Sequence, residues 1–165
     1  MALTKVQGEG ISGVSISANN EITMSSQPAF MAKLTSSQSS LGNSGSHVTF
    51  QFATEIFDQN ADYDNSTYIF TAPVTGRYQL SFAMYLNDID TASTFFYVTI
   101  KTSNREVYWI YDPNFSADLA YQTVAGTLLS DMDANDTAYI TFVQSGGSAQ
   151  VSANANSYFT GYLAC

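Results

Sequence analysis

Basic residues are scarce in this chain. Five Lys and Arg stand against 14 Asp and Glu, which gives a formal net charge of −9 at pH 7. Binding to a polyanion depends on clustered cations that displace counterions. We therefore expect neither nucleic acid nor an anionic membrane surface as a partner, because the basic residues are scattered (Lys5, Lys33, Arg77, Lys101 and Arg105).

Histidine and cysteine are rarer still, with one of each, His47 and Cys165. A Ser-His-Asp relay needs three groups in a fixed arrangement, and a zinc site needs several His or Cys ligands. The composition therefore predicts that the chain is not an enzyme and holds no zinc. A single cysteine forms no internal disulfide, and Cys165 is interpreted as a terminal residue of no consequence in preference to an intermolecular bridge.

Long apolar runs are also missing. No segment reaches the roughly 18 apolar residues of a membrane helix, and the opening residues MALTKVQGEG lack the apolar stretch of a secretory signal. We expect a chain that does not insert into a membrane. Charged residues make up only 12 %, so Ser, Thr, Asn and Gln must cover much of the surface.

Aromatic residues are abundant instead, at 14 %, with 11 Tyr and 11 Phe. Apolar and polar residues alternate with the period of two that half-buried strands show. Turn-forming clusters rich in Gly, Asn, Asp and Ser separate these runs. Many short strands predict an all-β sandwich or barrel. The predicted strands are 47–53, 77–86, 95–101 (apolar on both faces, hence covered on both), 137–143 and 158–163, with 117–129 ambiguous but favouring strand.

Residues 1–27 differ from the rest of the chain. They are rich in Gly, Ser and Asn and carry a weak alternation at Val14 and Ile16, then at Ile22 and Met24. This pattern predicts an N-terminal arm with one or two short strands, which could add to the sheet edge of a partner. The sequence thus divides into the arm, 1–27, and one domain, 28–165.

The segment from Phe52 to Phe82 resembles the signature of the C1q-like globular domain. Pro28-Ala29-Phe30 is similar to the opening strand of that family, and YFTGYL at 158–163 is similar to its closing strand. Leu80 stands where the family usually has an aromatic residue, a change that keeps the position apolar. The matched positions are Phe52, Asp58, Tyr63, Phe70, Gly76, Tyr78 and Phe82.

The resemblance implies a jelly roll of the tumour-necrosis-factor kind that assembles as a homotrimer. Residues of the family's inner sheet would form the trimer interface, and here they are Phe30, Tyr78, Phe159 and Tyr162. Some C1q-like domains bind calcium, which prefers carboxylate oxygens. Asp131, Asp133 and Asp136 are the weak candidates, although a solvated acidic turn explains them more simply, and we expect no cofactor.

The setting is suggested by the flanks of the domain. No collagen-like Gly-X-Y stretch precedes it, and LTKVQGEGI at the start resembles bacteriophage fibre and head-decoration proteins. We therefore expect a structural protein of a virus particle, a trimeric capsid-decorating or fibre knob. Its arm would bind other virion proteins.

Two alternatives remain open at this stage. The first is a module that binds a host glycan or receptor, at a fibre tip or in a secreted C1q-like lectin, through loops 87–92, 108–119 and 145–156. Trp109, Tyr111 and Phe115 are its candidate ligand surface, since aromatic faces bind sugars, although core or trimer packing also explains them. The second is an enzyme, for which only His47 offers a starting point.

Overall fold

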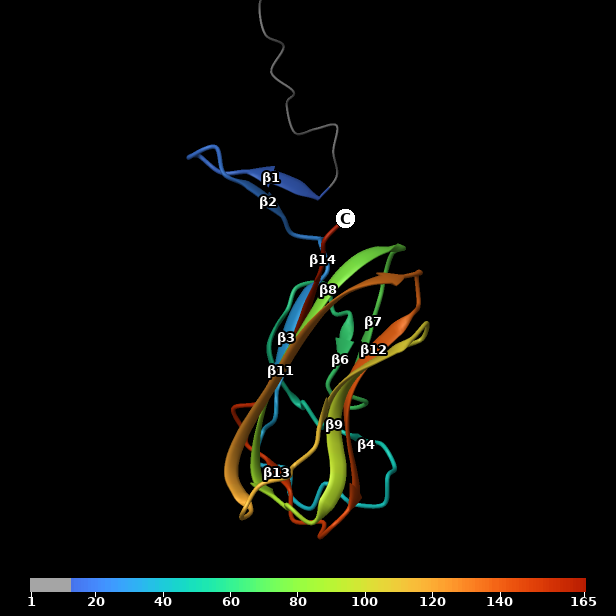
Figure 1. The fold of residues 1–165 in the computed structure, drawn as a ribbon. Coiled ribbons are helices and arrows are strands. Elements are labelled where there is room, and N and C mark those ends of the chain that lie inside the picture. Colours follow the sequence, from blue (N-terminus) through green and yellow to red (C-terminus); the bar gives the residue numbers. More distant parts are fainter. Residues whose placement is uncertain (1–12) are drawn as a thin grey trace, which may run out of the picture.

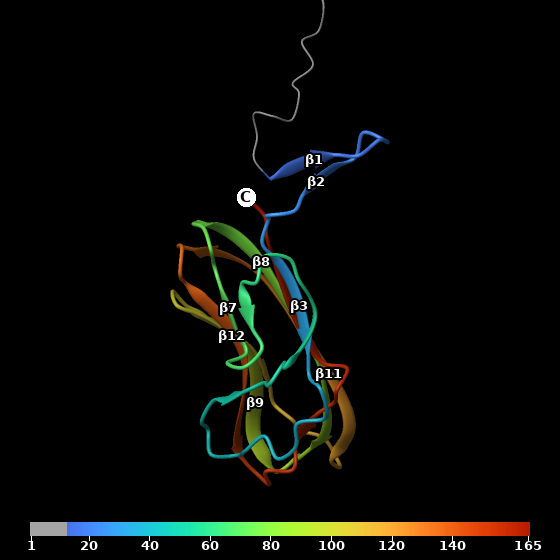
Figure 2. The same cartoon turned by 180° about the vertical axis from the view of Figure 1, so that it is seen from behind.

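The computed structural model describes residues 13–165, which form a sandwich of two antiparallel sheets and a separate two-stranded hairpin (Figures 1 and 2). Helices are absent from this part of the chain. The prediction of an all-β jelly roll is therefore confirmed. The resemblance of LTKVQGEGI to bacteriophage proteins falls on residues 1–12, which lie outside the described residues.

One sheet, which we name the β8 sheet, has the strand order β11-β8-β14-β3-β5, with β13 paired to β8. Its two longest strands, β8 and β11, pair along almost their whole length. The members of the sheet are β3 (Ala29–Lys33), β5 (Thr54–Asp58), β8 (Gly76–Ile89), β11 (Leu119–Met132), β13 (Ser152–Ala153) and β14 (Tyr158–Leu163).

The other sheet, the β9 sheet, has the order β10-β9-β12-β7-β6, with β4 paired to β12. Strand β9 is central and pairs with β10 on one side and β12 on the other. The members are β4 (Val48–Thr49), β6 (Tyr63–Asp64), β7 (Ile69–Thr71), β9 (Ser93–Thr102), β10 (Glu106–Tyr111) and β12 (Thr137–Gly146).

Aromatic side chains fill the space between the sheets. Phe30 of β3 stacks on Tyr63 and Phe70, with ring centroids 5.1 and 4.7 Å away, and meets Phe159 edge-on at 4.9 Å. Tyr63 donates its hydroxyl hydrogen to the carbonyl of Phe52, so the buried phenol is satisfied. The spaced aromatic residues of the sequence are thus the core that joins both sheets.

Two strand predictions need correction. Within 47–53 only Val48 and Thr49 form a strand, while Phe50 and Phe52 reach the core from irregular backbone. Residues 95–101 do form β9, but one face of it is partly open, because Phe95 and Tyr97 lie on the solvent side. The ambiguous stretch 117–129 is strand β11, as its composition favoured.

The hairpin of β1 (Val14–Ile16) and β2 (Ile22–Met24) confirms the strands expected in the described part of the arm. It lies beyond one end of the sandwich, and the C-terminus lies at that same end (Figure 1). We call this the arm end and the opposite end, where β13 lies, the distal end. Gln27 holds the arm to the sandwich, because its side-chain amide donates to the carbonyl of Leu163 at 2.6 Å.

Candidate functional site

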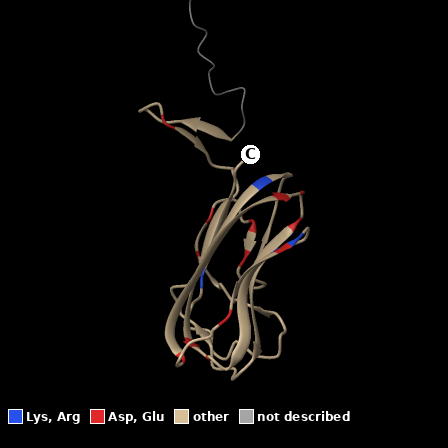
Figure 3. Ribbon diagram, viewed as in Figure 1, with Lys and Arg blue, Asp and Glu red and all other residues tan. Residues whose placement is uncertain are grey.

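The solvent face of the β8 sheet is poor in charge and rich in large apolar side chains. Charged residues gather mainly at strand ends and in loops (Figure 3). The charged residues of this face include Lys33, the last residue of β3, and the paired positions Arg77 and Asp131 near the arm end of β8 and β11. The exposed apolar residues are Phe57, Tyr85, Tyr121, Leu129 and Tyr162, with Met31 and Tyr158 partly exposed. We name the part of this surface nearer the arm end, with Met31, Phe57, Leu129, Tyr158 and Tyr162, the β8 face. Tyr85 and Tyr121 lie beyond it, toward the distal end.

Register explains how the face is assembled. Thr160 of β14 pairs with Met31 of β3 on one side and Ser81 of β8 on the other. Tyr162 pairs with Ala29 and Gln79, one row nearer the arm end. Residues two apart share a side of the sheet, so each strand adds every second residue to one continuous surface.

The predicted trimer-interface residues divide between the two sides of this sheet. Phe30, Tyr78 and Phe159 have no exposed surface and fill the core, so the prediction that they contact another copy is wrong. They lie in phase with Leu80 on the inner side of the sheet. Tyr162 has the opposite phase and is 50 % exposed, and it stays a candidate.

Three loops that are far apart in the sequence meet at the distal end. The carboxylate of Asp118 accepts hydrogen bonds from the Thr91 amide at 3.0 Å and from Gln150 at 2.9 Å. Asp90 accepts the backbone N–H groups of Ser148 and Ala92, which hold the pKa of Asp90 below its ordinary value. The loops proposed from the sequence as a contact surface are therefore brought together.

A shallow groove of about 450 Å³ lies where the distal loops meet the solvent side of the β8 sheet. Tyr85 and Tyr121 line it, and Tyr121 is 81 % exposed. The remaining lining includes amide side chains and no charged group: Leu86, Asn87, Gln122, Thr123, Asn154 and Asn156. Aromatic rings beside neutral donors and acceptors suit an uncharged polar ligand.

The aromatic residues predicted to bind a ligand are mostly turned inward. Trp109 meets Phe82 edge-on, with centroids 4.9 Å apart, and Tyr111 stacks on Phe96 at 5.3 Å. For these two residues the prediction is corrected, because alternation along β10 directs them at the core. Phe115 is exposed in the loop that joins β10 to β11.

His47 is held by two partners on the solvent side of the β9 sheet. Its Nδ1 lies 2.9 Å from the hydroxyl oxygen of Thr141, and its Nε2 lies 3.4 Å from a carboxylate oxygen of Glu106. The arrangement has the outline of a hydroxyl-His-carboxylate relay. Thr141 is only 1 % exposed, however, so its hydroxyl is inaccessible to a substrate and the geometry offers no nucleophile here.

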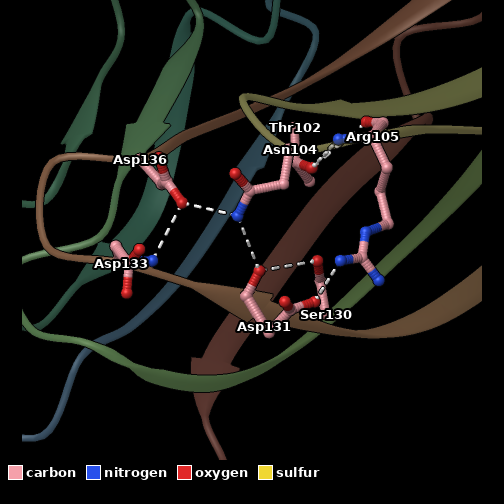
Figure 4. A network of polar contacts seen from close by, with 7 residues as sticks. All are labelled: Thr102, Asn104, Arg105, Ser130, Asp131, Asp133 and Asp136. Carbon is pink, nitrogen blue, oxygen red and sulfur yellow. Dashed lines mark hydrogen bonds and ion pairs between the residues drawn. The ribbon is translucent and has the colours of Figure 1, made fainter.

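The three carboxylates considered for calcium do not converge (Figure 4). Asp131 pairs with the Arg105 guanidinium at 2.6 Å, and Asp136 accepts from Asn104 at 2.7 Å and from the Asp133 amide at 2.8 Å. Across residues 13–165 no group of three or more His, Cys, Asp or Glu is placed to hold a metal ion. Asp131 and Asp136 therefore bind separate protein partners, and the three carboxylates do not form one shared site.

Sequence reasoning missed Tyr85, Tyr121 and Leu129. Tyr121 and Leu129 belong to the stretch left ambiguous between helix and strand, so their side of the sheet could not be assigned. Tyr85 did carry a usable signal, because it is out of phase with the core residues Met84 and Leu86 of its own strand.

Comparisons with known proteins agree with this geometry. Residues 29–164 match the C1q domain. The chain belongs to the C1q domain family. No curated protein matches the sequence. Among the described residues, no helix is long and apolar enough to cross a membrane.

Solved structures similar to this C1q domain include two kinds of protein. The globular domain of zebrafish complement 1qA has a TM-score of 0.58 and 16 % identity, and the match covers 84 % of this chain and 98 % of that one. Murine APRIL has a TM-score of 0.59 and 8 % identity, with 83 % and 98 % covered. At these identities the likeness shows the shared jelly-roll fold.

Proposed function

We propose that this C1q domain is a non-enzymatic binding protein that assembles as a homotrimer through the β8 face. The observation that carries the proposal is the exposure of the large apolar side chains Phe57, Leu129 and Tyr162 on one side of the β8 sheet. Contiguous apolar surface of this kind marks an association site. Domains of the C1q and TNF kind typically form trimers, which is consistent with it.

We further propose that the trimer is a knob on the surface of a virus particle, either decorating the capsid or ending a fibre. The arm would attach it to other virion proteins. The placement of the arm and the C-terminus at one end, with three clustered loops at the other, supports this orientation. An attached arm end would direct the distal loops outward.

Removal of residues 1–27 tests the attachment. The shortened chain, 28–165, keeps every strand of both sheets and should fold and associate. It should no longer be incorporated into particles assembled in its presence, whereas the full chain is incorporated. Incorporation of the shortened chain at the level of the full chain would refute anchoring by the arm.

A second function, binding of a glycan or receptor at the distal end, is favoured by the groove beside Tyr85 and Tyr121. A glycan array probed with the full chain and with Tyr121→Ala tests it, with Tyr108→Ala, an exposed tyrosine on the other sheet, as the matched control. Binding that Tyr121→Ala alone abolishes supports the groove. Absence of binding to any glycan or host cell leaves the structural role.

A further inference from the structure

The hairpin of the arm is apolar on one side only. Its register pairs Val14 with Met24 and Ile16 with Ile22, so these four side chains share one face, while Ser15 and Thr23 share the other. Ile16, Ile22 and Met24 are 55, 69 and 44 % exposed. None of the four joins the core of the sandwich as described for residues 13–165. We name this face the arm strip.

An apolar face that is left open to water does not stabilise a short hairpin. A two-stranded hairpin is marginally stable in water unless its apolar face packs against something. The strip also carries no charge, because Glu21, the charged residue of the hairpin, lies just outside β2 and accepts a hydrogen bond from the Ser17 hydroxyl at 3.1 Å. The strip can therefore meet an identical strip without repulsion between like charges.

The strip is held next to the β8 face. The Gln59 side chain donates to the Met24 carbonyl at 2.7 Å, and the backbone N–H of Gln27 donates to the same oxygen at 3.1 Å. A groove of about 560 Å³ runs between the hairpin and the sheet, and Met24 of the strip, Thr23 of the polar side and Tyr162 all line it. A chain seated on Tyr162 would thus also meet the arm strip.

We propose that the arm strips of the three copies pack against one another and extend the trimer interface beyond the sandwich. The proposal rests on the homotrimer proposed above. Rotational symmetry places three identical hairpins at the same end of the assembly, where each presents the same surface to its neighbours. Since the groove joins Met24 of the strip to Tyr162 of the β8 face, we take a second copy seated on that face as the occupant. Attachment to a particle then falls to the remainder of residues 1–27.

Disulfide trapping tests which side of the hairpin meets another copy. In full-length protein carrying Cys165→Ala, Ile16→Cys or Ile22→Cys, each as a single substitution, places a thiol on the arm strip, and the matched control Ser15→Cys places it on the polar side of the same strand pair. A disulfide forms only where two Cα atoms come within about 7 Å. We expect several-fold more interchain disulfide from the strip positions. Equal or greater trapping from Ser15→Cys would overturn the proposal.

A second measurement does not depend on thiol geometry. Ile16→Thr with Ile22→Thr keeps the β-branched shape and removes the apolar surface, and Ser15→Thr is its control on the polar side. The double variant should dissociate into single chains at lower denaturant than the unmodified protein, with Ser15→Thr unchanged. A double variant that dissociates like the unmodified trimer, but no longer joins particles, would show that another protein covers the strip.

The light-scattering mass of the unmodified protein separates the two proposals. A single-chain mass refutes the trimer, and with it the packing of the strips. A trimer in which strip positions are trapped no better than Ser15→Cys refutes the packing of the strips alone.

Discussion

At the scale of single residues, Gly161 shows how tightly the core is filled. It lies in β14 on the inner side of the sheet, between Phe30 and Leu80 in the neighbouring strands. A Cβ at this position would stand 2.8 Å from both Leu80 Cδ2 and Phe30 Cε1. The approach is made mainly by side chains.

Gly161→Ala should therefore lower the free energy of unfolding by about 1–3 kcal/mol, the usual cost of overpacking a filled core. Chemical denaturation followed by tyrosine and tryptophan fluorescence measures it. Thr94→Ala, at an exposed position of β9, is the control and should stay within about 0.5 kcal/mol of the unmodified protein. A neutral Gly161→Ala would mean that Leu80 and Phe30 pack less closely around this position than described.

Asp90 gives the distal end a dependence on pH. Its pKa is lowered in the folded state by the N–H groups of Ser148 and Ala92. A group with a lowered folded pKa stabilises the fold above its unfolded pKa of about 4, and this stabilisation is lost as the pH falls through the folded value. Asp90→Asn should melt below the unmodified protein at pH 7, and the gap should close at low pH. A gap that is constant with pH would contradict this role.

The side of a strand that a residue occupies could be predicted better than its role. The alternation of Tyr78, Leu80 and Phe82 already placed Tyr78 on the core side, and the structure confirms that side. The error was to assign Tyr78 also to an interface. Because successive residues point to opposite sides, Tyr162 and Phe159 could not both have faced another copy.

At the scale of elements, the turn after β9 docks on the turn after β11 (Figure 4). Asn104 donates to the carbonyl of Asp131 at 3.3 Å and to the carboxylate of Asp136 at 2.7 Å. One side chain thus joins the two sheets at the arm end. The Arg105–Asp131 ion pair spans the same turns but is about half exposed, so we expect it to add less.

Asn104→Ala should destabilise the protein by about 1 kcal/mol, because two hydrogen bonds between the turns are lost. Asn60→Ala is the matched control, since Asn60 bonds only to Asp62 within its own loop. Thermal unfolding of both variants and of the unmodified protein measures the difference in stability. Equal effects of the two substitutions would show that the docking of the turns contributes nothing specific.

Strands were predictable where alternation was long and strict, as in β8, β12 and β14. The meeting of the distal loops was not, because Asp90, Asp118 and Gln150 are brought together only by the order of strands in the two sheets. Local pattern carries no information on that order. The groove beside Tyr121 depends on it as well, and so lay beyond the sequence.

At the scale of the whole molecule, we expect an assembly with two different ends. The β8 face would be covered by neighbouring copies, the arm end would attach, and the distal loops would remain open. Tyr162→Asp, which puts a charge among the exposed apolar residues of the β8 face, should convert the trimer to single chains with intact strands. Circular dichroism and light scattering together check this. A trimer that survives Tyr162→Asp would move the interface away from this row of the face.

The native mass of the full chain in solution, by light scattering or native mass spectrometry, tests the proposed homotrimer. We expect three chains per assembly over a broad range of protein concentration, since the exposed apolar residues of the β8 face would be buried between copies. A mass of one chain at every concentration would contradict it.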